Sequence, residues 1–97
     1  MRVVHWNKLA KQDYFANIDF LLKEWSVTQA QNFINEVYEI EFILKQGNID
    51  FQDTNRHGIK RCVLNRHITL FYKIIDEHNI ELLRFWNNSR DINQITL

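Results

Sequence analysis

Proline is absent from this chain of 97 residues, which has only two glycines and a single cysteine. So few helix breakers and turn formers indicate short connections between regular elements. The lone Cys62 excludes an internal disulfide, and the four histidines share no ligand spacing, so the sequence predicts no metal site. There is neither a phosphate-binding glycine loop nor a nucleophile motif, and we expect no cofactor.

Long apolar runs are also missing. No stretch approaches the ~20 residues that a membrane helix needs, and residues 1–6 lack the apolar core of a signal peptide. We therefore expect a cytoplasmic protein that does not contact membranes. The chain has 45% apolar residues, and its length suits one domain, residues 1–97, with a single core.

The first half of the chain predicts a strand followed by two helices. Residues 2–6 form a short β-branched segment that is typical of a strand. Asn7 can cap a helix of about seventeen residues. Its predicted apolar stripe recurs every three or four positions and consists of Ala10, Tyr14, Ile18, Leu21, Leu22 and Trp25. Ser26 and Gln29 have the spacing of a capping box that starts a second helix, and Gly47 is its expected stop.

The second half of the chain alternates between apolar and polar residues. This pattern predicts strands at 59–64, 68–75 and 80–86, after a polar loop at 48–57. The element order is then β-α-α-β-β-β. It indicates an α+β fold in which a helical hairpin packs on one face of a small antiparallel sheet.

A four-residue hairpin loop at 76–79 assigns side chains to the two faces of this sheet. The expected pairs are Ile75 with Ile80, Lys73 with Leu82, and Phe71 with Arg84. The side chains expected beneath the helices are Leu70, Tyr72, Ile74, Leu83 and Phe85. Those expected on the opposite, open face are Thr69, Phe71, Lys73, Leu82, Arg84 and Trp86, a set without an acid. Leu83→Ala should therefore cost about 2–5 kcal/mol, and Arg84→Ala should be nearly neutral for folding.

Charge is segregated along the chain even though its net charge is zero. Residues 54–75 carry five basic side chains and no acid, whereas residues 24–53 carry six acids and one lysine. This pattern predicts a positive surface for a charged partner, either phosphate or an acidic protein segment, although a solubilising face fits equally well. Arg61 is expected to face the helices beside Tyr72, unless a bulge turns it outward.

Clustered basic side chains offer the only chemistry that the sequence suggests. Guanidinium groups bind phosphate, and they can stabilise the charge that develops when a ribose 2′-hydroxyl attacks a phosphodiester. His67 or Tyr72 could move the proton. A ribonuclease site would therefore be built from Arg61 and Arg84 with His67.

Several segments of the sequence, taken in order, resemble the RelE/ParE superfamily, the toxins of bacterial type II toxin–antitoxin modules. The segments are His5–Ala10, Glu24–Ser26 followed by Ala30 and Phe33, Gly58–Arg61, Thr69–Tyr72, and Leu83–Asp91. The resemblance implies a first strand that adds beside the last one. It also implies growth inhibition, plasmid stabilisation, and a cognate antitoxin that wraps the toxin in a hetero-oligomer.

Two branches of the superfamily imply different targets. RelE-like members cut mRNA on the ribosome and use a tyrosine or histidine near the C-terminus, but neither residue type follows Trp86. ParE-like members poison DNA gyrase without nuclease activity, and the ending of this chain resembles that branch more closely. A third hypothesis is a non-toxic binding module of the same fold.

The ParE-like hypothesis assigns two sets of contact residues. The residues expected to bind the target are Phe71, Lys73, Arg84, Trp86 and Arg90. The residues expected to bind the antitoxin are Leu9, Phe20, Lys73 and Arg84.

Overall fold

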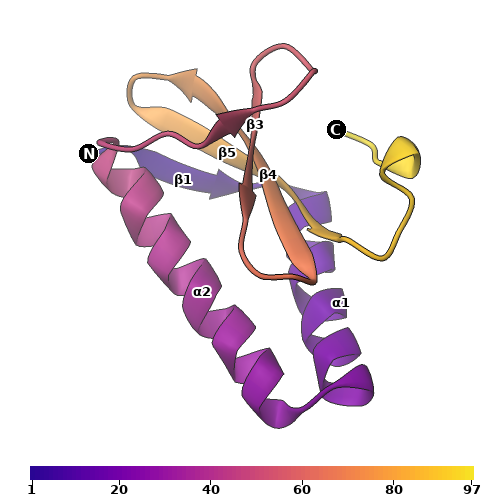
Figure 1. The fold of residues 1–97 in the computed structure, drawn as a ribbon. Helices are drawn as coiled ribbons and strands as arrows, with labels where there is room; N and C mark the ends of the chain where they lie inside the picture. The colour runs from indigo at the N-terminus through magenta and orange to yellow at the C-terminus, as the bar shows by residue number, and fades with distance from the viewer.

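The computed structural model describes all residues, 1–97, and contains two long helices on one face of a five-stranded sheet (Figure 1). The elements are β1 (Val3–Trp6), α1 (Lys8–Glu24), α2 (Val27–Gln46), β2 (Gln52–Asp53), β3 (Ile59–Val63), β4 (Ile68–Asp76), β5 (Asn79–Asn87) and the 3-10 helix η1 (Ile92–Gln94). The strand order is β1-β5-β4-β3-β2. The predicted α+β fold is confirmed. Neither helix has the length and apolarity that a membrane crossing requires.

β1 lies beside β5, as the family resemblance implies, but the two strands run parallel. The other neighbouring strands are antiparallel, so the sheet is mixed, and the expectation of a purely antiparallel sheet is wrong. The connection from β1 to β5 passes through both helices and three strands. A parallel partner can therefore be reached without a tight turn.

Local capping signals fix the ends of both helices where the sequence predicted them. Asn7 Oδ1 accepts a hydrogen bond from Ala10 N at 2.7 Å, and Ser26 Oγ accepts one from Gln29 N at 3.1 Å. Gly47 ends α2 in the left-handed conformation, with φ of 75°. A Cβ atom there would also lie 3.1 Å from Arg2 Nε, so both the backbone and its surroundings favour glycine.

The main core lies between the helices and the sheet. Its fully buried members include Phe33 and Leu44 of α2, Leu70 and Tyr72 of β4, and Phe85 of β5. The apolar stripe predicted for α1 is wrong near its end. Leu22 and Trp25 are half exposed, and Asn17 takes a buried position on this helix instead.

Asn17 is buried because α1 covers the free edge of β5. β1 pairs only with residues 79–82 of β5. Beyond that point, Phe85 N donates to Asp13 Oδ2 at 3.1 Å, and Asn17 Nδ2 donates to Phe85 O at 2.8 Å. Two polar side chains of α1 thus satisfy backbone groups that a strand edge would otherwise leave unpaired.

The hairpin between β4 and β5 differs from the predicted one. Asp76 pairs with Asn79, so the loop has two residues rather than four. The register shifts at Ile75 and again at Leu83, each of which is an extra residue in its strand. Of the three expected pairs, only Phe71 with Arg84 is confirmed.

The second shift exchanges the faces of two leucines. Leu82 pairs with Tyr72 and is buried in the main core, whereas Leu83 belongs to a separate cluster on the open face. The expectation that Leu83 packs beneath the helices and Leu82 faces outward is therefore wrong. A sequence that alternates between apolar and polar residues does not reveal where one extra residue is inserted in a strand.

The open face is partly covered by the C-terminal tail, residues 91–97, through Ile95. In Figure 1 the tail is the yellow segment that turns back beside the strands. Ile95 of the tail is buried against Phe71, Leu83 and Trp86. These four side chains form a second, smaller cluster. The aromatic side chains expected on this face are present there, but they are buried.

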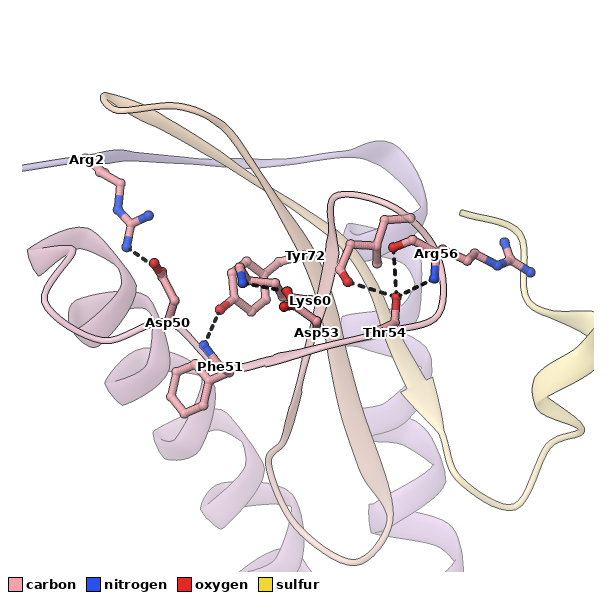
Figure 2. A network of polar contacts seen from close by, with 9 residues as sticks. Arg2, Asp50, Phe51, Asp53, Thr54, Arg56, Lys60 and Tyr72 are labelled. Atoms are coloured by element: carbon pink, nitrogen blue, oxygen red, sulfur yellow. Dashed lines mark hydrogen bonds and ion pairs between the residues drawn. The ribbon is translucent and has the colours of Figure 1, made fainter.

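Polar contacts also order the segment predicted as a loop at 48–57 (Figure 2). Phe51 N donates to Tyr72 Oη at 2.9 Å, and Lys60 Nζ lies 2.7 Å from Asp53 Oδ1. Burial raises the pKa of the Tyr72 hydroxyl, which is fully enclosed on the helix side. Tyr72 therefore anchors the strand β2 and is not available to move a proton on the open face.

Candidate functional site

A cavity of about 560 Å³ opens on the open face beside the C-terminal tail. Its polar lining residues are Asp53, Thr54, Asn55, Arg61, Thr69, Asn88 and Arg90, and its apolar ones are Val63, Phe71, Trp86 and Ile92. We call it the arginine cavity. It joins residues from β2, β3, β4, β5 and the tail, which are distant in the sequence.

Arg61 reaches this cavity because of the register between β3 and β4. Arg61 pairs with Phe71, and it is Lys60 that lies opposite Tyr72. The expectation that Arg61 faces the helices is wrong. The Asn65 side chain accepts hydrogen bonds from His67 N at 2.7 Å and Ile68 N at 3.0 Å, which shapes a longer turn than the sequence suggested.

Arg90 reaches the cavity by stacking on Trp86. The Arg90 guanidinium carbon lies 4.2 Å from the centroid of the Trp86 ring, and that of Arg84 lies 5.2 Å from it. Trp86 is only 2% exposed, and its Nε1 is buried without a hydrogen-bond partner. Trp86 therefore serves as the platform that holds Arg90 at the cavity.

Arg84 is held in a buried ion pair and is not free to contact a partner. Its Nε and Nη2 donate to Asp13 Oδ2 and Oδ1 at 2.6 and 3.0 Å, and its Nη1 donates to Thr96 O at 3.2 Å. Arg84 is 8% exposed. A buried bidentate pair contradicts the expectation that Arg84→Ala is neutral for folding, because the change would leave Asp13 uncompensated.

The expectation of an acid-free open face is also wrong. Lys73 Nζ lies 3.5 Å from Glu81 Oε1 on the neighbouring strand. Lys60 is likewise paired, with Asp53, and this hydrogen bond raises the pKa of Lys60. Two cationic side chains line the arginine cavity, Arg61 and Arg90, and neither has an ion-pair partner.

His67 lies away from the arginine cavity. Its ring packs against Trp25, with the centroids 4.6 Å apart, and more loosely against Phe20 at 6.4 Å. The structure thus brings together Arg61, Phe71, Trp86 and Arg90, and it separates His67 and Lys73 from them.

Thr69 and Asn88 are lining residues that sequence reasoning missed as site residues. Thr69 Oγ1 donates to Asn88 Oδ1 at 2.8 Å, which connects the start of β4 to the chain just after β5. Asn88 lies in the segment Leu83–Asp91 that carries the family resemblance. Its position just after a predicted strand was the sequence feature that could have identified it as a site residue.

A second concave region lies between the two helices and is mainly apolar. This hairpin groove has a volume of about 460 Å³, and its lining residues are Trp6, Lys11, Tyr14, Phe15, Ile34, Val37, Tyr38 and Glu41. Phe15 and Tyr38 are 64% and 77% exposed. Exposed aromatic side chains beside a groove are typical of a docking surface.

The two apolar residues predicted for antitoxin binding lie outside this groove. Leu9 is 37% exposed, and Phe20 is half-buried beside a small depression that also includes Asn87 and Arg90. Phe15 was missed because it lies off the predicted apolar stripe of its helix. An aromatic residue off the predicted apolar stripe was the sequence feature that could have identified this docking surface.

Comparisons with known proteins agree with this architecture. The sequence model of the ParE toxin of type II toxin–antitoxin systems, parDE, matches residues 4–92. A structure of the chromosomal ParDE toxin–antitoxin system from P. aeruginosa is similar, with a TM-score of 0.73 and 18% identity over 90% of this chain and 96% of that one. No curated protein sequence matches the chain.

Two further structures share the fold at lower similarity. A copper-bound mutant toxin from Helicobacter pylori has a TM-score of 0.62 and 17% identity, over 92% of this chain and 97% of that one. The E. coli DinJ-YafQ complex has a TM-score of 0.62 and 10% identity, over 92% and 96%. The family match covers both helices and all five strands of this chain apart from Val3, the first residue of β1. The protein therefore belongs to the ParE toxin family and is the toxin component of a type II toxin–antitoxin system.

Proposed function

We propose that this toxin inhibits growth by binding a protein target, DNA gyrase, through the arginine cavity and the surface around it. The observation that carries the proposal is the composition of the cavity. Arg61 and Arg90 are held there without acidic partners, and no histidine, tyrosine or glutamate lines the walls. Such a site is suited to binding anionic groups, and it lacks a free proton carrier.

The one acid in the cavity wall is Asp53, and it is already engaged by Lys60 at 2.7 Å. A ribonuclease needs a general base within about 3 Å of the hydroxyl that it deprotonates. His67 packs against Trp25 instead, and Tyr72 is enclosed on the other side of the sheet. These positions support binding over cleavage.

Ribosome-dependent cleavage of mRNA is the alternative function. The observation in its favour is that Arg61 lines the same cavity of the open face as Arg90, and guanidinium groups there would stabilise a phosphodiester transition state. A third possibility is a non-toxic binding module with the same fold.

We further propose that the cognate antitoxin docks in the hairpin groove. The similar structures from P. aeruginosa and E. coli are described as a toxin–antitoxin system and a toxin–antitoxin complex. The exposed rings of Phe15 and Tyr38 provide the apolar anchors that such a partner needs. Leu9, Phe20 and Lys73 remain predicted contacts at the margins, and Arg84 remains a predicted contact that would first have to leave Asp13.

Two assays on one preparation test the proposed target: inhibition of DNA supercoiling by gyrase, and ribosome-dependent cleavage of mRNA. We expect inhibition of supercoiling that is lost in Arg61→Gln and Arg90→Gln and kept in the control Arg66→Gln, which lies outside the cavity. mRNA cleavage that depends on Arg61 would establish the ribonuclease alternative. Inactivity in both assays, together with harmless expression in cells, would leave the binding module.

The docking of the antitoxin is tested separately, by co-expression with the adjacent open reading frame. Phe15→Asp should abolish co-purification of the two chains. The matched control Val27→Asp places the same charge on an exposed apolar residue of α2 that does not line the groove. Equal loss in both variants would contradict docking in the groove.

A further inference from the structure

We propose that the arginine cavity binds a single carboxylate side chain, such as a glutamate, of the protein partner, with Arg61 and Arg90 as its cationic donors and the Trp86 ring as the surface that positions Arg90. The inference rests on the proposed function, because it names the group of the target that the cavity recognises. It also makes a claim that is testable on the isolated protein.

The first step of the argument is the indole of Trp86. This side chain lines the cavity and is 2% exposed, yet its Nε1 has no acceptor among the protein atoms. It is the only buried side-chain nitrogen or oxygen in the chain without a hydrogen-bond partner. Because the Nε1 atom itself has almost no accessible surface, the indole acts as a rigid wall of the cavity that holds Arg90, and its N–H signal reports on changes at that wall.

The second step is the state of the two arginines. Arg90 is stacked on the Trp86 ring at 4.2 Å, which orients the guanidinium and leaves its N–H groups at the edge free to donate. Arg61 donates only its Nε, to Gln52 Oε1 at 3.3 Å. Its terminal N–H groups are free, and neither arginine has an acidic partner. The cavity therefore offers preorganised donors without an acceptor of matching charge.

The third step distinguishes a carboxylate side chain from a nucleic-acid strand. Apolar walls formed by Val63, Phe71 and Ile92 suit the methylene groups of a glutamate. Asp53 contributes a negative charge to the same wall, which disfavours a polyanion more than a single carboxylate. The net charge of the chain is zero, whereas proteins that bind free nucleic acid are usually basic.

The experiment uses the full chain labelled with ¹⁵N and follows the indole N–H signals of its three tryptophans by NMR. The Trp86 signal is assigned as the one that disappears in Trp86→Phe. The probe is N-acetyl-glutamate amide, and the matched neutral probe is N-acetyl-glutamine amide. Both are added at concentrations on the order of tens of millimolar, because one side chain without its protein binds weakly.

We expect the carboxylate probe to shift the Trp86 signal in a saturable way, because Arg90 lies on the Trp86 ring, and the amide probe to leave the signal in place. Arg61→Gln and Arg90→Gln should each weaken binding by about tenfold, the effect of losing one charge-assisted hydrogen bond. Arg66→Gln, which removes the same charge outside the cavity, should bind the probe as the unmodified protein does. Thermal melts of the variants show that each one is folded.

Three results would overturn the proposal. The first is a Trp86 signal that does not respond to the carboxylate probe, and the second is an equal response in Arg61→Gln and Arg90→Gln. The third is tighter binding of a dinucleotide than of the carboxylate, which would assign the cavity to phosphodiesters. The gyrase assay is independent of this titration. A carboxylate response without gyrase inhibition would therefore refute the target and keep the site, and the reverse would refute the site alone.

Discussion

The two faces of the sheet are held together by different kinds of interaction. On the helix face, apolar side chains from both helices and three strands form one core, and no ion pair crosses it. On the open face, three side chains of the sheet are buried with Ile95 of the tail, and a buried ion pair and the two arginines over Trp86 adjoin this cluster. The helix face depends mainly on burial of apolar area, with added hydrogen bonds between backbone groups and the side chains of Asn17 and Tyr72. The open face depends more on a few specific polar contacts between residues far apart in the chain.

This difference explains why the polar cavity lies on the open face, whereas the concave region on the helix side is the mainly apolar hairpin groove. Close packing leaves little space for a ligand in a core that is covered by two helices. The open face has a short tail as its cover, and Ile95 is the one residue of that tail that is buried. A cavity remains beside that cover, and the arginines at its wall keep their donors free.

The largest expected effect compares adjacent leucines on opposite faces. Leu82→Ala should lower the free energy of unfolding by about 3–5 kcal/mol, because the residue is fully buried between rigid elements. Leu83→Ala should cost about 2 kcal/mol, because the tail above it can settle into part of the space. Urea unfolding of both variants measures the difference, and a larger loss for Leu83→Ala would invalidate the distinction between the faces.

The next effect tests the ion pair that joins the open face to α1. Arg84→Ala should cost about 3 kcal/mol, since it leaves the Asp13 carboxylate, itself mostly buried, without its partner. The matched control is Lys73→Ala on the same face. Its partner Glu81 is 3.5 Å away and the lysine is half exposed, so we expect a loss below about 1 kcal/mol. Equal melting temperatures for the two variants would show that burial of the Arg84 pair adds nothing.

A smaller effect concerns the tail. Ile95→Ala should cost about 1–2 kcal/mol, less than a change in the main core, because a chain end can open locally. It should also make Trp86 more accessible to acrylamide quenching of fluorescence. Ile92→Ala is the control, since Ile92 belongs to the same tail but is half exposed. If both variants leave quenching unchanged, the tail does not protect Trp86.

The sequence predicted the helix face better than the open face, and particular residues show why. Asn7, Ser26 and Gly47 act within a few residues of their own positions, so their spacing alone revealed the helix ends. The order of both helices and of four of the five strands was also correct, as was the place of β1 beside β5, but the two-residue strand β2 lies in the segment that was predicted as a loop. These features depend on local signals or on the family resemblance.

The arginine cavity depends on contacts that no local pattern encodes. The bulge at Leu83 reverses two side chains, and the turn at Asn65 decides that Arg61 points outward. Asp13 pairs with Arg84 across 71 residues of sequence. Residue types at the site were therefore identified, but their burial and partners were not.

The smallest expected effect is a pH dependence that originates on the helix face, at Cys62 of β3. Burial raises the pKa of the Cys62 thiol from 9.0 to about 11. Above pH 9 the thiol ionises in the unfolded chain but stays protonated in the folded protein, so the folded state binds more protons and its stability falls as pH rises towards 11. Between pH 7.5 and pH 10 this contribution amounts to a loss of about 1 kcal/mol. Cys62→Ala removes it and leaves the tyrosines, which also titrate in alkali, unchanged. Urea unfolding at both pH values should therefore show a fall that is about 1 kcal/mol smaller in Cys62→Ala than in the unmodified chain, and equal falls would mean that solvent reaches the thiol through the sheet.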